Sequence, residues 1–230
     1  MKIKFYAHAS FRLEGDGLTI VTDPFNCAKS HFDPINEPAD IVLMSSDTDD
    51  FHSDPSHVQG TPEVVNTLAI PPGGRVVKGI TVTSYPATES LTFDYQTEYG
   101  RDPDANALYH FTVGGLRFLH MGDIGTAVPD GHLQALKGKV DVLLALTGAH
   151  ATIPLDDLDR AIQVIGPRAV IPMHYYSPRG VLKIEPVESY LARVPTDRVT
   201  HVGGPEMELT ADMLPAAGTA PRVFVFEQSR

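Results

Sequence analysis

The chain has 230 residues, of which 42% are hydrophobic and 20% are charged, and its formal net charge is −11. This length is enough for one sizeable domain with a well-buried core. The negative charge argues against a nucleic-acid partner and against anionic membranes, because both bind through clusters of Lys and Arg. No run of about 18 apolar residues predicts a membrane span, and the start of the chain lacks the apolar core of a signal peptide. Since Cys27 has no second cysteine to pair with, we expect a cytoplasmic protein.

The first part of the chain has the pattern of a hairpin followed by a buried strand. Apolar residues alternate on both sides of Gly15-Asp16-Gly17, which predicts a tight turn between two strands, and Asp23 follows the second strand. The continuous apolar run 39–44 predicts a strand that is covered on both faces. Residues 62–70 are compatible with a short helix or a strand, and β character returns over 76–87.

A second hairpin is predicted over 107–119, with Gly114-Gly115 as its turn. Asp123 follows this hairpin, just as Asp23 follows the first one. The repeated order of strand, glycine turn, strand and aspartate indicates two similar halves.

The last third of the chain alternates between strands and helices. Residues 154–165 have apolar positions at helical spacing, begin at a proline and are followed by Gly166-Pro167, which ends the helix. A second helix is predicted over 186–194, and strands are predicted over 140–146, 169–173 and 222–227. Strands that come first and later alternate with helices predict an α+β fold with sheets covered by helices. Because no segment looks like a linker, residues 1–230 are predicted to form a single domain.

Polar side chains that follow the ends of three predicted strands are candidates for a shared site. Such residues are held by a rigid scaffold and point into a common crevice. Carboxylates and imidazoles together bind divalent cations or act as an acid/base pair. The local sequence also allows a solvated acidic loop, a structural Gly-Asp turn and a hydrogen-bonded histidine. The candidates are Asp47, Asp49, Asp50, His52, His120, Asp123 and His174.

Four motifs, in this order, resemble the metallo-β-lactamase superfamily: HASFRLEGDGLTIVTDPF, ADIVLMSSDTDDFH, LHMGDIG and AVIPMHYYSP. The resemblance covers nearly the whole chain and is greatest to small bacterial hydrolases similar to ascorbate-6-phosphate lactonase. It implies a four-layer αββα sandwich with a metal site at one edge of the two central sheets. It also implies metal-dependent hydrolysis as the activity.

The metal-binding signature of that superfamily, Thr-His-x-His-x-Asp-His, falls on residues 45–51 of this chain. Ser46 and Thr48 replace its two leading histidines, and Asp50 keeps its aspartate. The closing histidine is displaced by one residue, to His52. The resemblance therefore implies a degenerate signature.

The other ligands that the resemblance implies are unevenly kept. Glu89 stands near the position of the middle histidine, whereas the bridging aspartate is kept as Asp123 and the final histidine as His174. One metal of the family's pair has thus lost its histidines, and hydroxyl groups replace imidazole poorly on Zn²⁺. The other metal keeps most of its ligands.

We therefore predict at most one divalent metal ion, which would be Zn²⁺, Mn²⁺, Mg²⁺ or Fe²⁺. Its predicted ligands are Asp50, Asp123, His174 and, if the loop shifts its register, His52. A free carboxylate, Asp49 or Glu89, is predicted as the general base. His120 and His150 are predicted partners for the carboxylates where no metal binds, and we interpret His8 as structural.

Three functions are compatible with these residues. The first is a metal-dependent hydrolase with an eroded dinuclear site that acts on an ester, a lactone or a phosphodiester. The alternative is a non-catalytic relative that binds a small ligand or a protein partner through the old active-site pocket. A third is acid/base chemistry without a metal by Asp50, Asp123 and His174. A small-molecule substrate or ligand is the expected partner, and a homo-oligomer is compatible with this fold.

Overall fold

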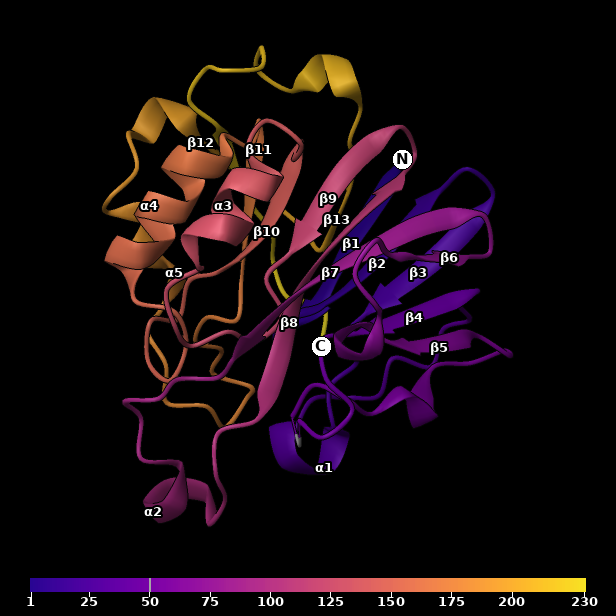
Figure 1. Cartoon of the computed structure of the whole chain (residues 1–230), viewed down its shortest axis with the longest axis vertical. Helices are drawn as coiled ribbons and strands as arrows, with labels where there is room; N and C mark the ends of the chain where they lie inside the picture. The colour runs from indigo at the N-terminus through magenta and orange to yellow at the C-terminus, as the bar shows by residue number, and fades with distance from the viewer. Residues whose placement is uncertain (50) are drawn as a thin grey trace.

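Two β-sheets stack on each other in the computed structural model, which describes residues 1–49 and 51–230 (Figure 1). The strands of the first sheet are β1 (Lys2–Ala7), β2 (Ser10–Gly15), β3 (Leu18–Thr22), β4 (Ile41–Met44), β5 (Glu63–Asn66) and β13 (Glu206–Glu208). Those of the second are β6 (Arg75–Val77), β7 (Ile80–Thr88), β8 (Ala105–Val113), β9 (Leu116–His120), β10 (Val142–Leu146), β11 (Ala169–Met173), β12 (Val199–His201) and β14 (Arg222–Val225). The first has the order β13-β1-β2-β3-β4-β5, and the second has the order β12-β14-β11-β10-β9-β8-β7-β6. We call them the six-stranded and the eight-stranded sheet.

Tight turns with positive φ angles join the strands of both predicted hairpins. Asp16 and Gly17 link β2 to β3 with φ angles of 54° and 75°, and Gly114 and Gly115 link β8 to β9 with 59° and 72°. Two successive residues of this kind are typical of the type I′ turn, which fits the twist of a hairpin. The two turns touch, because the Gly114 amide donates a hydrogen bond of 2.6 Å to Asp16 Oδ2. Both predicted hairpins are confirmed.

Parallel strands form the part of each sheet that leads to the candidate site. β3, β4 and β5 run parallel, as do β9, β10, β11 and β14. Every residue of β4, β10 and β11 is buried, as their continuous apolar runs predict. The segments that follow β4, β9 and β11 bring their polar side chains to one edge of the sandwich.

Helices α3 (Asp130–Leu136), α4 (Leu155–Ile165) and α5 (Val187–Leu191) cover the outer face of the eight-stranded sheet (Figure 1). α4 buries Leu158, Ala161 and Ile165, and it ends at Gly166, whose φ of 67° is the left-handed conformation of a helix cap. This confirms the first predicted helix. The second predicted helix is shorter than expected, and α3 lies outside the predicted elements.

A layer made mainly of loops covers the outer face of the six-stranded sheet. Phe25, Phe32, Ile35 and Val58 pack there in a second buried cluster that includes Tyr6. The short helix α1 (Cys27–Ser30) lies in the same part of the chain, and α2 (Tyr95–Tyr99) projects beyond the ends of the strands (Figure 1). The predicted four-layer arrangement is therefore present, with helices on one side and mostly loops on the other.

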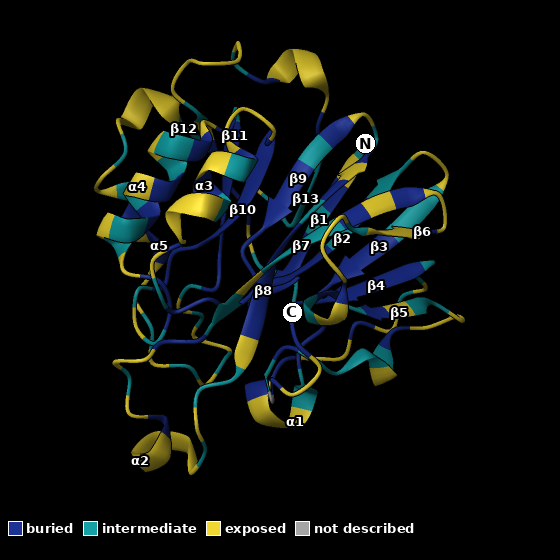
Figure 2. Ribbon diagram, in the orientation of Figure 1, coloured by how far each residue is buried: buried dark blue, intermediate teal, exposed yellow. Residues whose placement is uncertain are grey.

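The main core lies between the two sheets and beneath the helices (Figure 2). It combines strand residues of both sheets with the inner faces of α3, α4 and α5. Close packing of this kind gives a rigid support for the polar residues at the strand ends. Among residues 1–49 and 51–230, no helix is long and apolar enough to cross a membrane.

Asp141 joins the start of β10 to the neighbouring strand and provides a test of this packing. Its carboxylate accepts hydrogen bonds from the Arg117 amide at 3.0 Å and from Arg117 Nε and Nη2 at 2.9 Å each. Burial opposes the charge, but the hydrogen bonds from Arg117 outweigh it and lower the pKa of Asp141. We expect Asp141→Asn to cost about 1–2 kcal/mol at neutral pH, because the guanidinium is partly exposed.

The same variant should show a defined pH dependence in urea unfolding. A carboxyl group whose folded pKa is lowered stabilises the fold above its ordinary pKa, and this stabilisation is lost as pH falls through the folded value. The difference between the wild type and Asp141→Asn should therefore be full at neutral pH and disappear in acid. Asp197→Asn changes an exposed aspartate and is the control. An equal loss in both variants would contradict this account.

Candidate metal centre

Among the described residues, five buried acidic and histidine side chains meet at this edge of the sandwich. They come from the turn between β1 and β2 and from the segments after β4, β9 and β11. Their exposed fractions lie between 1% and 7%. Ionisable groups are seldom buried this deeply unless they are paired or bind a metal. The five residues are His8, Asp49, His52, Asp123 and His174.

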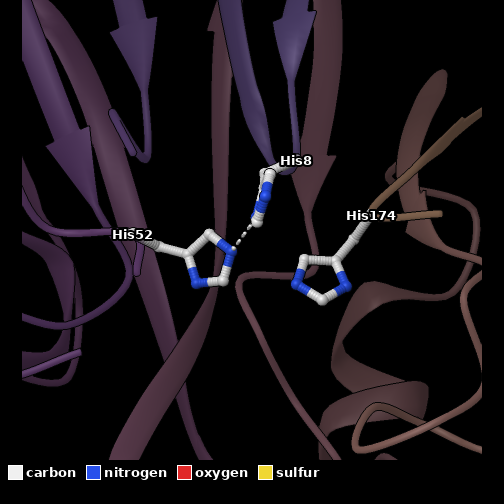
Figure 3. A group of neighbouring side chains, drawn as sticks. All are labelled: His8, His52 and His174. Carbon is white, nitrogen blue, oxygen red and sulfur yellow. Dashed lines mark hydrogen bonds between the residues drawn. The ribbon is translucent and has the colours of Figure 1, made fainter. Parts of the chain in front are cut away.

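His52 lies at the centre of this cluster, and its two ring nitrogens face different partners. Nδ1 lies 2.9 Å from Asp49 Oδ2 and 3.6 Å from Asp123 Oδ2, whereas Nε2 lies 3.2 Å from His8 Nδ1. One potential ligand atom from each of His8, His52 and His174 lies within 4.8 Å of the other two (Figure 3). The same holds for Asp49, His52 and Asp123. The cluster thus offers two overlapping groups of metal-binding atoms that share His52.

The loop after β4 turns inward because side-chain carboxylates bind its backbone. The Ser45 amide donates to Asp23 Oδ1 at 2.6 Å. Asp49 Oδ1 accepts from the amides of Phe51 at 2.8 Å and His52 at 3.2 Å. Aspartate side chains favour such turns by bonding to the backbone just ahead of them. This turn brings His52, one residue beyond the signature position, into the cluster, as the predicted shift of register requires.

The side chains at the two leading signature positions bond to each other. Ser46 Oγ lies 3.1 Å from Thr48 Oγ1 and accepts from the Thr48 amide at 3.2 Å. These positions therefore form a local hydroxyl turn where the superfamily signature has histidines. Asp50, a predicted metal ligand, lies outside the described residues.

Asp123 is held in place by a close approach of three segments. Gly122, which precedes it, has a φ of 60°, and a Cβ there would lie 2.3 Å from Asn106 Oδ1 and 2.8 Å from Ser45 Cβ. Only glycine fits this contact and this conformation. The Asp123 amide donates to Asn106 Oδ1 at 2.9 Å. The carboxylate of Asp123 is thereby fixed beside the loop that carries His52.

His8 and His174 share an unusual backbone conformation. Both have a φ of 51°, which is uncommon outside glycine, and the His174 amide donates to the His8 carbonyl at 2.8 Å. The left-handed region costs an L-residue about 1–2 kcal/mol. A Cβ on Gly148 would lie 2.3 Å from the His174 carbonyl oxygen, so the backbone there is also tightly packed. Such strained positions are a recurring feature of functional sites.

His120, a predicted partner for the carboxylates, instead supports the backbone of the site. Its Nε2 lies 2.7 Å from the Ala9 carbonyl, and its Nδ1 accepts from the Gly122 amide at 2.9 Å. Both ring nitrogens are therefore engaged with backbone groups. His150, the other predicted partner, lines the cavity above the cluster, with its ring 5.0 Å from that of Phe93. The position between the carboxylates is occupied by His52.

Burial and the charge of His52 set the ionisation of the cluster. Burial opposes the charge of His52, but Asp49 and Asp123 outweigh it and raise its pKa to about 10. Burial also opposes the charge of Asp49, and His52 overcomes it and lowers the pKa of Asp49 to about 2. Burial raises the pKa of Asp123 well above its ordinary value. Burial and the charge of His52 lower the pKa of His174 to about 3 and that of His8 well below its ordinary value.

Buried polar atoms in the cluster make no hydrogen bond with any described residue. They are Nδ1 and Nε2 of His174 and Oδ1 of Asp123. His174 Nε2 and Asp123 Oδ1 lie 3.6 Å apart, which is too far for a hydrogen bond. Buried polar atoms normally have partners, so an imidazole nitrogen and a carboxylate oxygen left facing each other fit a bound cation.

A cavity of about 360 Å³ opens above the cluster and reaches Asp123, His52 and His174. Its walls carry Phe51, Phe93, Tyr95 and Tyr99 on the aromatic side and residues 181–184 elsewhere. The aromatic rings contact one another, with centroid distances of 4.8 Å for Phe93–Tyr95, 5.7 Å for Phe51–Tyr99 and 5.8 Å for Phe93–Tyr99. A concave, mostly apolar pocket with a few convergent polar groups is typical of a small-molecule site.

Comparison with known proteins places this geometry in a family. Residues 2–174 match the family model of the β-lactamase superfamily domain. A UPF0173 metal-dependent hydrolase of Carboxydothermus hydrogenoformans is 32% identical over 195 residues, which cover 76% of this chain and 84% of the relative. The chain belongs to the UPF0173 metal-dependent hydrolases of the metallo-β-lactamase superfamily. The resemblance found in the sequence is thus confirmed at this level, and the narrower likeness to ascorbate-6-phosphate lactonase stays a prediction.

Solved structures agree with the fold of this metallo-β-lactamase superfamily member. A proposed zinc-dependent hydrolase of the same superfamily from Thermotoga maritima matches 99% of both chains, with 26% identity and a TM-score of 0.73. A proposed metal-dependent hydrolase from Parabacteroides distasonis shares the fold, with 17% identity and a TM-score of 0.62 over 99% of this chain.

Glu89, a predicted general base of this superfamily member, is bound on both oxygens. Arg101 donates to Oε2 at 2.6 Å and to Oε1 at 2.9 Å, and the Asp104 amide donates to Oε2 at 2.7 Å. Burial nevertheless raises the pKa of Glu89. The catalytic role of Glu89 therefore remains a prediction, and its visible role is to anchor the segment that carries α2.

Removing the guanidinium should expose the dependence of this segment on the ion pair. Because Glu89 is buried, Arg101→Gln should cost about 3 kcal/mol by leaving the carboxylate without its charged partner. The double variant Glu89→Gln/Arg101→Gln should recover most of this loss. Urea unfolding of the two single variants and the double variant measures the coupling. Additive losses would mean that the pair does not stabilise the segment.

Proposed function

We propose that this protein is a metal-dependent hydrolase that works with one divalent cation in the His/Asp cluster. The observation that carries the proposal is the pair of buried, facing atoms His174 Nε2 and Asp123 Oδ1, neither hydrogen-bonded to a described residue. His52 stands beside them and completes the predicted ligand set within the described residues. Membership of a metal-dependent hydrolase family supports the same reading.

The replaced signature residues support a single cation over a pair. Ser46 and Thr48 stand where the superfamily has histidines and bond to each other. Glu89 stands near the third histidine position, and Arg101 binds its carboxylate. The ligands of one family metal are thus exchanged for side chains with other partners, and this is what an eroded dinuclear site would look like.

The donor chemistry of the cluster narrows the choice of cation. Imidazole nitrogens and carboxylate oxygens together suit Zn²⁺, Fe²⁺ or Mn²⁺, whereas Mg²⁺ prefers oxygen ligands and retained waters. When bound, such a cation supplies Lewis acidity and lowers the pKa of water. Metal-binding histidines must be neutral, and burial keeps His174 in that form.

The chain's own groups would move the proton and place the substrate. Asp49 and Glu89, the predicted general bases, already accept hydrogen bonds from His52 and Arg101, respectively. Asp123 Oδ1 accepts none from the described residues, so it is the carboxylate oxygen best placed to take a proton from water in the cavity. The aromatic wall would bind the apolar part of a substrate and exclude bulk water.

The cavity favours an uncharged ester or lactone with an apolar group over a phosphodiester. Four aromatic side chains form one wall, and the charge of Arg101 is balanced by Glu89. A doubly apolar and aromatic lining binds rings and alkyl chains through burial of their surface. A phosphodiester would need cationic partners that this wall does not offer among its aromatic residues.

Metal content tests the proposal directly. Protein purified without chelators should contain about one transition metal per chain, and the double variant Asp123→Ala/His174→Ala should lose it. Metal at a hundredfold excess over Kd should stabilise the fold by about 2.7 kcal/mol, and each kcal/mol raises Tm by about 2–4 °C for a chain of this size. His150→Ala, which removes a histidine from the cavity wall, is the matched control. Absence of metal after exposure to Zn²⁺ and Mn²⁺ would overturn the proposal.

Substrate preference tests the role of the aromatic wall. Tyr99→Ala should raise KM for an aryl ester about tenfold, the equivalent of about 1.4 kcal/mol of lost contact, and should leave kcat nearly unchanged because Tyr99 lies away from the cluster. Tyr176→Ala removes an exposed tyrosine that does not line the cavity and should change neither constant. A metal-loaded protein that hydrolyses no ester, lactone or phosphodiester would instead favour the non-catalytic, ligand-binding relative.

A further inference from the structure

We propose that His8 is a metal ligand, so that His8, His52 and His174 form a three-histidine centre. This inference rests on the proposed function and adds a ligand that the superfamily signature lacks. It explains how a chain that has lost the signature histidines can still offer several imidazoles to a cation. His8 lies far from the signature in the sequence and reaches the site through the turn between β1 and β2.

The distances among the rings match those of metal ligands. With Zn–N bonds of about 2.0–2.1 Å, two ligand atoms of a tetrahedral site lie roughly 3.3–3.4 Å apart. His8 Nδ1 lies 3.2 Å from His52 Nε2, and His174 Nε2 lies 3.6 Å from Asp123 Oδ1. Figure 3 shows the three imidazoles entering from three separate segments and facing a common space. Asp123 is thus the natural fourth group of the centre.

Asp49 sets the orientation of His52 that this centre requires. Its Oδ2 lies 2.9 Å from His52 Nδ1, so the proton of the ring belongs on Nδ1 and the lone pair on Nε2 points towards His8. A carboxylate behind a ligating histidine is the usual device for fixing its tautomer and direction. Asp49 is therefore a positioning residue in this account.

The turn that carries His8 is built at some cost in conformational energy. His8 and Ala9 connect paired residues of β1 and β2 without a glycine, although His8 has a φ of 51°. The glycine turns of the other two hairpins avoid this strain. Three hydrogen bonds hold the turn: the His174 amide binds the His8 carbonyl, and Thr22 Oγ1 and His120 Nε2 bind the Ala9 carbonyl. Strain retained under such support points to a functional role for the side chain.

The surroundings of His8 also suit a neutral ligand. The Phe32 ring lies edge-on at 4.9 Å, and the Phe51 ring is stacked at 6.4 Å. An apolar shell of this kind keeps water away and favours the uncharged imidazole, which is the form that binds a metal. The competing explanation is a plain hydrogen bond between His8 and His52, in which His8 serves only to hold the loop.

Cobalt(II) titration of the purified protein separates these explanations. The visible bands of bound cobalt report on the number of nitrogen ligands, and the titration gives the affinity without any assay of activity. His8→Gly removes the imidazole and tolerates the positive φ, so its apoprotein should melt no lower than the wild type. We expect the variant to bind cobalt at least about 100-fold more weakly, the upper end of what loss of a supporting group costs, with a changed spectrum.

Matched variants define the outcome. His8→Asn, which also tolerates the left-handed region, replaces His8→Gly if the glycine variant does not fold. Asp49→Asn should weaken cobalt binding by about 10–100-fold and keep a spectrum close to that of the wild type. His150→Gly should change neither quantity. Equal affinity and an unchanged spectrum in His8→Gly would overturn this inference alone, whereas a wild type that binds no cobalt would overturn the proposed function with it.

Discussion

One hydrogen bond between the two sheets underlies the geometry of the site. The His174 amide, after the last residue of β11, donates to the carbonyl of His8, in the turn that begins the six-stranded sheet. His120 adds a second link to the same turn through the Ala9 carbonyl. Because both contacts join groups that are far apart in sequence, the cluster forms only when the two sheets have packed. The buried core between the sheets therefore supplies the energy that holds strained, dehydrated imidazoles together.

Much of the fold follows from local patterns in the sequence. Glycine turns such as Gly114-Gly115 predict the hairpins, and continuous apolar runs predict the buried parallel strands. α4 has both helical spacing and a glycine stop at Gly166. In contrast, α3 begins at Pro129 without a side-chain cap and is only seven residues long, so its signal is weak. β12 and β13 have three residues each and exist through pairing with β14 and β1, which no local pattern reveals.

The site was predictable where its residues directly follow buried strands. Asp123 and His174 are of this kind, and His52 entered the prediction as a shift of register along the loop. His8 was missed because its position depends on a turn that is shaped by contacts with distant segments. The signal in the sequence was a short turn without glycine between two apolar strands, with a histidine in it. The signature residues also changed role, since Glu89 gained a partner in Arg101 that no motif announces.

The central claim is that the buried cluster is a metal centre, and crystallography can test it without reference to any substrate. Crystals soaked in zinc should be measured on both sides of the zinc absorption edge. This account predicts one strong anomalous peak bounded by His8, His52, His174 and Asp123. A peak only at exposed carboxylates, or none at all, with His8 still hydrogen-bonded to His52, would show that the cluster is a structural network and would contradict the account.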